Sequence, residues 1–299
     1  LVIPGKKIVV SGTGPLIFYV ASEIRRLGGE VSAIVTPNSP LDWMCAIPSM
    51  FSRPDLLWRG FVWVADLLLA GTPIFWRNVI KQIDGENKVQ SVTISKVSND
   101  WSPLVQKRSI EADSVCIGYG LQAATEASQL SGIDLKYQSE LGGWVPEARE
   151  NGETAIDGLF VCGDGAGIRG AAAAEIHGKL VGLSAADFVT SKVNFPRSAL
   201  LTSFRRASRF GMAMTALSIP RKGLQKLTTD RTIMCRCESL RRCDMEYEME
   251  VGAATINAIK SGSRAGMGPC GGKYCQAAIA KLIAEKENLT EAEIIPPTP

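Results

Sequence analysis

The sequence predicts an α/β fold followed by a small, mainly helical domain. The first 35 residues contain a strand, a glycine turn, a helix and a second strand, in that order. A second glycine-rich turn, at residues 163–167, stands between an apolar run and another helical stretch. Four cysteines then fall in two close pairs between residues 235 and 275. With 299 residues, the chain is long enough for about two domains with buried cores.

The composition is that of a globular protein, with 45% hydrophobic and 21% charged residues. A net charge of +3 does not indicate nucleic-acid binding. The most apolar stretch, residues 60–76, is interrupted by Asp66 and Pro73 and is shorter than the roughly 20 residues of a membrane span. Eight cysteines without a visible secretory signal predict a reducing, cytoplasmic location and metal or redox use of the thiols.

The N-terminal segment reads as a strand, turn, helix and strand. Residues 6–11 form an apolar run, typical of a buried parallel strand, and residues 16–27 form a helix that stops at a glycine pair. Residues 31–35 form the second strand. This βαβ unit is typical of a Rossmann-like nucleotide site, in which Gly12 and Gly14 would let a phosphate approach the N-terminus of the helix.

This first turn departs from the usual dinucleotide pattern at two places. The third glycine of GxGxxG would fall at position 17, which holds an isoleucine. After the second strand, residues 35–38 offer neither a carboxylate for a ribose nor an arginine for a 2′-phosphate. Three interpretations therefore remain open: NAD(P)H, another adenine nucleotide, or a scaffold that binds no nucleotide.

Further elements are predicted between the two glycine turns. A proline-rich connection is followed by a helix whose apolar side chains recur at helical spacing, which favours core packing over a cofactor site. Strands and a second helix follow around short turns. The expected elements are the connection 37–54, helix 55–70, strands 79–83, 88–94 and 112–117, and helix 122–130.

The second glycine turn is predicted to lie between a buried strand at residues 158–162 and a helix at 171–183. A carboxylate here, Asp164, could meet ribityl or ribose hydroxyls beside a phosphate-binding helix N-terminus, with Gly163 giving close approach. The alternative is that Asp164 caps the following helix. Cys162, inside the expected strand, is predicted to be a buried and inert thiol.

The chain has a single histidine, His177, on the predicted helix after this turn. A lone helical histidine is more often structural than catalytic. The sequence offers no Ser-His-Asp set, no Cys-His pair and no histidine-rich metal site, so hydrolytic chemistry is excluded. We predict no catalytic side chain of this chain's own.

The cysteine pairs are Cys235 with Cys237 and Cys270 with Cys275. Two short loops that each present two thiolates suit a four-cysteine [2Fe–2S] cluster, and the glycines of residues 266–272 would bring amide N–H groups toward sulfur. The alternative is structural zinc, although the first pair is spaced more tightly than zinc ligands usually are. Cys243 is not counted as a ligand. Short helices are expected at residues 246–251, 255–259 and 275–285.

Together these motifs resemble a known family. They occur in this order: Gly12-Thr13-Gly14-Pro15-Leu16, the 158–167 run, Cys235-Arg236-Cys237-Glu238, and the 264–270 run. The family is that of the α-type subunits of FAD-dependent amino-acid and opine dehydrogenases. It includes the octopine and nopaline oxidase A subunits, the HcnB-type chain of hydrogen cyanide synthase and the α subunit of dye-linked proline dehydrogenase. The C-terminal part is similar to bacterioferritin-associated-ferredoxin-like [2Fe–2S] domains.

This resemblance implies a two-dinucleotide-binding-domain flavoprotein fold and an electron-transfer role. Electrons would pass from a catalytic β-type flavoprotein subunit, which oxidises an amino acid, imino acid or opine, to FAD and the [2Fe–2S] cluster of this chain. A small ferredoxin-like subunit is a further implied partner, and membrane association would come only through partners. The resemblance assigns Gly163 and Asp164 to flavin contacts and Gly12 and Gly14 to the phosphate turn of the nicotinamide-type domain.

The chain departs from the family at its start. The family begins with a strand and GxGxxG turn that hold the FAD pyrophosphate, and no such segment precedes Lys6. We therefore expect either a fragment or a split gene, and weak FAD binding by this chain alone. The expected domains are a NAD(P)-type domain at 1–112, the second half of the FAD-type domain at 113–193, a helical connector at 194–228, the [2Fe–2S] domain at 229–290 and a tail at 291–299.

Overall fold

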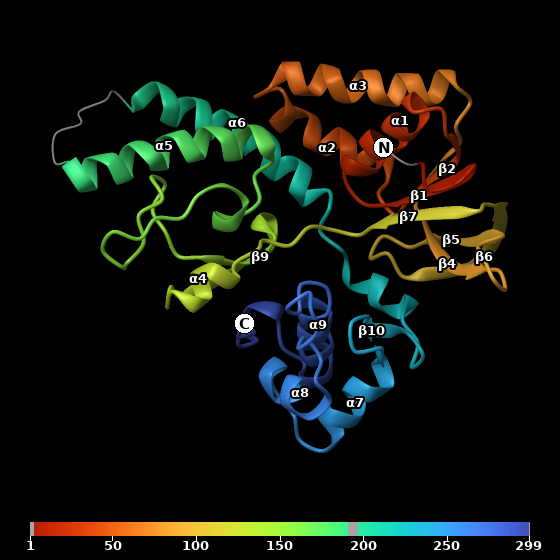
Figure 1. Ribbon diagram of the computed structural model, residues 1–299. Coiled ribbons are helices and arrows are strands. Elements are labelled where there is room, and N and C mark those ends of the chain that lie inside the picture. Colours follow the sequence, from red (N-terminus) through yellow and green to blue (C-terminus); the bar gives the residue numbers. More distant parts are fainter. Residues whose placement is uncertain (1–2, 191–196, 299) are drawn as a thin grey trace. The chain divides into compact units, whose positions relative to one another are not determined.

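The computed structural model describes residues 3–190 and 197–298 and divides into two compact units. The first unit comprises residues 1–121 and 206–227, and the second comprises residues 122–205 and 228–299 (Figure 1). No helix of the described part of the chain is long and apolar enough to cross a membrane.

A four-stranded parallel sheet in the order β3-β2-β1-β7 forms the centre of the first unit. Helices α1 and α3 pack on one face, where Ile8, Phe18 and Leu67 share a buried core (Figure 1). The bounds are β1 (Lys7–Gly12), α1 (Leu16–Arg26), β2 (Glu30–Thr36), α3 (Pro54–Leu69), β3 (Ile74–Trp76) and β7 (Ser114–Gly118). The βαβ unit expected at the N-terminus is confirmed.

The other face of the parallel sheet packs against an antiparallel sheet in the order β4-β5-β6. Val9 and Val35 of the first sheet share a core with Val92 and Ile94 of the second. The bounds are β4 (Asn78–Asp84), β5 (Ser91–Val97) and β6 (Pro103–Glu111). The sequence pattern missed β6 because seven of its nine side chains are exposed, so its apolar alternation is weak.

The proline-rich connection at residues 37–54 contains a helix that the sequence pattern did not predict. Helix α2 (Pro40–Met50) begins with a capping box in which Ser39 and Asp42 satisfy each other's backbone N–H groups. Pro40 occupies the first turn, where its missing N–H costs nothing. The prolines that indicated a loop thus stand at a helix start.

In the second unit, a short antiparallel hairpin precedes the second glycine turn and two long helices. The bounds are α4 (Glu126–Leu130), β8 (Leu135–Gln138), η1 (Ser139–Leu141), β9 (Gly143–Pro146), η2 (Gly163–Ala166), α5 (Ala171–Thr190) and α6 (Ser198–Ala216). Residues 206–216 of α6 belong to the first unit, as does η3 (Lys222–Leu227).

The strand expected at residues 158–162 is not formed. Within this stretch only Phe160 makes a β-bridge, with Glu153, and a strand requires a partner along its length. Cys162 is exposed. The prediction of a buried, inert thiol at this position was therefore wrong, because the expected strand does not cover it.

The C-terminal part of the second unit is small and mainly helical, as predicted. Its core contains the buried side chains of Met245, Ile259 and Ile283. The bounds are β10 (Ile233–Cys235), β11 (Leu240–Arg241), α7 (Arg242–Glu250), α8 (Ile256–Ser263), α9 (Gln276–Glu287) and η4 (Glu291–Glu293).

Candidate functional site

The four predicted cysteine ligands lie on two loops of the C-terminal helical part. Cys235 ends β10, Cys237 lies in the turn before β11, Cys270 lies in the glycine loop after α8, and Cys275 is the N-cap residue of α9. Cys235 and Cys275 are each 1% exposed and belong to the same core. Cys237 is exposed and Cys270 is half-buried. The loops therefore present two thiols inside the domain and two toward its surface.

The cysteines that contact one another come from different loops. A hydrogen bond from Cys237 lowers the pKa of the Cys270 thiol. Burial, followed by the neighbouring Cys235, raises the pKa of Cys275 to about 12. The structure thus gives two contacting pairs, Cys237 with Cys270 and Cys235 with Cys275.

The glycine loop is shaped around these sulfurs. Backbone N–H groups of Gly272, Tyr274 and Lys273 point at Cys270 and also lower its pKa, as N–H donors to a thiolate do. Gly272 has φ +81°, a conformation that glycine adopts without strain. A Cβ at Gly268 would overlap the Cβ of Cys237. The expectation that glycines bring amides toward sulfur agrees with this geometry.

This donor set fits a binuclear cluster. Among the described residues, no group of three or more His, Cys, Asp or Glu side chains is gathered closely enough to hold a single metal ion. Two contacting thiol pairs match the two cysteine ligands that each iron of a four-cysteine [2Fe–2S] cluster takes. A tetrahedral zinc site needs four ligands around one centre. Cys243 is exposed, with its sulfur 3.9 Å from the carboxylate of Asp244, and takes no part in the two pairs.

The second glycine turn, η2, leaves its carboxylate in solvent. The Asp164 side chain is exposed and makes no hydrogen bond or ion pair with another described residue. It stands well before Ala171, the first residue of α5, so it is not the N-cap of that helix. Gly163, at φ +63°, donates its N–H to Nδ1 of His177 at 3.3 Å. A flavin contact by Gly163 and Asp164 stays a prediction, with the carboxylate free for it.

The first glycine turn is closed by its own unit. The N–H of Gly14 donates to Oδ1 of Asn38 at 3.4 Å, and the hydroxyl of Thr13 donates to the carbonyl of Ser218 at 3.0 Å. A Cβ at Gly14 would overlap Oγ of Ser218. Asn38 also donates to the carbonyl of Leu217 at 3.0 Å. A phosphate at Gly12 and Gly14 would have to displace these groups, so that assignment stays a prediction.

Sequence reasoning missed Asn38 and Ser218 as partners of this turn. Asn38 stands where a dinucleotide site would carry a carboxylate or an arginine, and an amide at that position was not expected to matter. Ser218 is about 200 residues away in sequence, and no local pattern connects it to Gly14.

Comparison with known families identifies the cysteine-bearing part. Residues 233–285 match the BFD-like [2Fe-2S] binding domain. This BFD-like domain includes all four cysteines of the two contacting pairs. The prediction of a [2Fe–2S] cofactor is confirmed at the level of the domain, whereas its individual ligands stay predictions.

Nearly the whole chain is similar to curated subunits of oxidoreductases. It is 28% identical to the A subunit of opine oxidase from Agrobacterium tumefaciens (strain Ach5), over 97% of this chain and 58% of that protein. It is 26% identical to hydrogen cyanide synthase subunit HcnB of Pseudomonas aeruginosa, over 89% of this chain and 58% of that protein. The resemblance indicated by the motifs is confirmed. The chain spans under two thirds of the length of these relatives.

The fold is similar to that of a solved dehydrogenase. The crystal structure of L-proline dehydrogenase from P. horikoshii matches with a TM-score of 0.59 and 18% identity, over 99% of this chain and 47% of that chain. The predicted fold class, an α/β dinucleotide-binding arrangement followed by a helical [2Fe–2S] domain, is confirmed.

The BFD-like domain shares its core with the β8–β9 hairpin. Trp144 of β9, 8% exposed, belongs to the same buried cluster as Cys235 and Cys275. Its ring meets that of Tyr137 edge-on, at 5.2 Å between centroids. On the other side of the hairpin, the carbonyl of Leu141 accepts the N–H of Ile168, just after η2, at 2.8 Å. The hairpin therefore connects the second glycine turn to the cysteine core.

Proposed function

We propose that this chain is the electron-transfer, α-type subunit, or a part of it, of a flavin-dependent dehydrogenase or oxidase. The substrates of the complete enzyme would be amino acids, imino acids or opines, with CH–NH or CH–NH₂ groups as electron donors. The chain would work with a catalytic β-type flavoprotein subunit, and a small ferredoxin-like subunit is a further candidate partner. Nucleic acid is not among the proposed partners.

The observation that carries this proposal is the arrangement of the four cysteines. Cys235, Cys237, Cys270 and Cys275 would hold the cluster, in a loop that directs backbone N–H groups at sulfur. When bound, a [2Fe–2S] cluster accepts and passes single electrons, so it can divide the two-electron output of a flavin. The protein's contribution is to set the distance, the dryness and the hydrogen bonding around the cluster.

Flavin is the proposed electron source for this cluster. The β8–β9 hairpin joins η2, where Gly163 and Asp164 would contact FAD, to the core that contains Cys235 and Cys275. Both sites lie in the second unit, which favours short transfer between them. The relatives, named as oxidase and synthase subunits, support partner subunits for this chain as well.

The alternative of an NAD(P)H-dependent FAD oxidoreductase has less support. The Gly14 N–H is engaged by Asn38, and the face of Gly14 is covered by Ser218. A zinc-bound scaffold without redox activity is disfavoured by the pairing of the thiols. Both alternatives are distinguishable by one preparation.

The decisive experiment is anaerobic purification of the chain, followed by a visible spectrum and assays of iron, acid-labile sulfide and zinc. The proposal expects about two irons and two sulfides per chain, a coloured protein and little zinc. NADH should not bleach that colour. A colourless protein loaded with zinc would refute the electron-transfer function, and rapid bleaching by NADH would favour the oxidoreductase alternative.

A further inference from the structure

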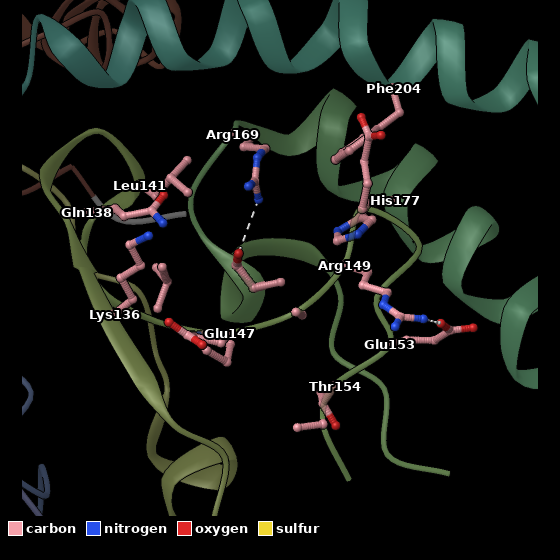
Figure 2. A pocket seen from close by; sticks show the side chains of 16 residues that line it. Lys136, Gln138, Leu141, Glu147, Arg149, Glu153, Thr154, Arg169, His177 and Phe204 are labelled. Carbon is pink, nitrogen blue, oxygen red and sulfur yellow. Dashed lines mark hydrogen bonds and ion pairs between the residues drawn. The ribbon is translucent and has the colours of Figure 1, made fainter. Parts of the chain in front are cut away.

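A cavity of about 690 Å³ lies in the second unit, on the side of η2 that faces the β8–β9 hairpin (Figure 2). The segment 147–155, α5 and Phe204 of α6 complete its wall. Its volume is in the range of pockets that enclose small organic molecules. The proposed electron-transfer function gives this cavity no role.

Arg169 lines the cavity as a half-buried cation without a counter-ion. Its Nη1 donates to the carbonyls of Ala166 at 3.1 Å and Gly167 at 3.3 Å, and no ion pair joins it to another described residue. The neighbouring carboxylate of Glu150 is held by Arg205 through two hydrogen bonds of 2.9 and 2.8 Å. A partly buried charge without a partner is costly, so this guanidinium favours an anion from outside the chain.

His177 adds a hydrogen-bond donor to the same cavity. The side chain is 4% exposed and stacks on Phe204, with ring centroids 4.6 Å apart and planes 18° apart. Its Nδ1 accepts the N–H of Gly163, so the proton of the neutral ring is assigned to Nε2. Among the described residues, Nε2 has no hydrogen-bond partner. A buried N–H group without an acceptor favours a ligand oxygen.

The facing wall carries both signs of charge. Lys136 and Gln138 extend from β8, and Glu147 follows β9, as Figure 2 shows. Neither Lys136 nor Glu147 has an ion-pair partner in the described part of the chain. Arg149, by contrast, is paired with Glu153 at 3.1 Å. The cavity thus offers donors for an anion and a free carboxylate for a cation.

We propose that this cavity binds a small amino or imino acid. The ligand carboxylate lies against the guanidinium of Arg169 and the Nε2–H of His177, and its ammonium group is balanced by Glu147. A phosphate fits less well, because the carboxylate of Glu147 would repel its second negative charge. The choice of amino and imino acids among carboxylates rests on the proposed function, while the carboxylate site itself rests on Arg169 and His177.

Direct binding tests this site. Isothermal titration calorimetry of the full chain with L-proline should give saturable binding, with glycine and sarcosine as further probes. Pyrrolidine, which is proline without its carboxylate, should bind at least about tenfold more weakly, since charge-assisted hydrogen bonds are lost. Arg169→Gln should weaken proline binding by a similar factor. Lys179→Gln removes a positive charge that α5 already pairs with Glu175, outside the cavity, and should leave binding within about twofold.

Several results would overturn the proposal. These are absence of binding by all three amino acids, equal binding of proline and pyrrolidine, or equal affinity of the Arg169→Gln protein and the wild type. Proline binding that FAD abolishes, together with lower FAD affinity in Arg169→Gln, would assign the cavity to flavin and would also overturn it. Iron and sulfide assayed in the same samples test the proposed electron-transfer function separately, because Arg169 lies outside the BFD-like domain.

Discussion

Gly268 lies directly against Cys237, so that a Cβ on the glycine would overlap the Cβ of the cysteine. This contact joins the loop of the second cysteine pair to the loop of the first. Any side chain at position 268 must therefore push the two loops apart. The separation of the sulfurs depends on that contact more than on the two sequence intervals within the pairs.

Gly268→Ala should reduce cluster loading by several-fold. Added volume in a packed site costs about 1–3 kcal/mol, and here it displaces a proposed ligand. The measurement is iron and sulfide per chain after anaerobic purification. Gly182→Ala on α5 is the matched control, because a Cβ there meets nothing within 4 Å. Equal loading of the two variants would contradict the role of the Gly268 contact.

Cys237→Ser should abolish the visible cluster spectrum, whereas Cys243→Ser should leave it unchanged. Cys237 contacts Cys270, one half of a proposed iron ligand pair. Cys243 is exposed like Cys237 but faces Asp244 instead. The two variants are matched in chemistry and exposure, so loss of the spectrum in both would show that the assignment of ligands is wrong.

The sequence predicted the cysteine set but not its pairing in space. Adjacent cysteines suggested that Cys235 belongs with Cys237, whereas the structure pairs Cys235 with Cys275. That pairing depends on how α7 and α8 fold between the loops, which no spacing records. The same limit explains the missing strand at 158–162, because a strand depends on partners elsewhere in the chain. Local signals were sufficient for the first βαβ unit, where all partners lie within about 30 residues.

The missed helix α2 had a readable local signal. Ser39, Pro40 and Asp42 are a cap, a first-turn proline and the third residue of a capping box. The density of prolines in residues 37–54 obscured them. By contrast, the placement of Trp144 in the cysteine core had no local signal, because its neighbours are about 90 residues or more away.

Trp144→Ala should lower the free energy of unfolding by about 3–5 kcal/mol, the cost of removing a buried aromatic side chain. The variant should also lose cluster, because the cavity opens beside Cys235 and Cys275. Denaturant titration and iron content measure the two effects. Trp58→Ala is the control, since Trp58 is 66% exposed and its loss should cost well under half as much. Equal destabilisation by both variants would contradict the packing of the hairpin on this core.

The sole histidine predicts how stability depends on pH near neutrality. Burial, followed by the charge of Arg169, lowers the pKa of His177 below its ordinary value of about 6.5, although the carbonyl and carboxylate of Glu150 oppose this shift. Between the two pKa values the unfolded chain binds more protons than the folded chain. Stability is therefore complete above pH 6.5 and falls as the pH decreases.

Denaturant titrations of the wild type should give a smaller free energy of unfolding at pH 5.5 than at pH 7.5. His177→Gln removes the only histidine, so its stability should change less over this interval, even if it is lower throughout. The carboxylate of Glu150 does not contribute here, because Arg205 keeps its pKa below its ordinary range. An unchanged dependence on pH in His177→Gln would mean that the imidazole is not held neutral by its buried position beside Arg169.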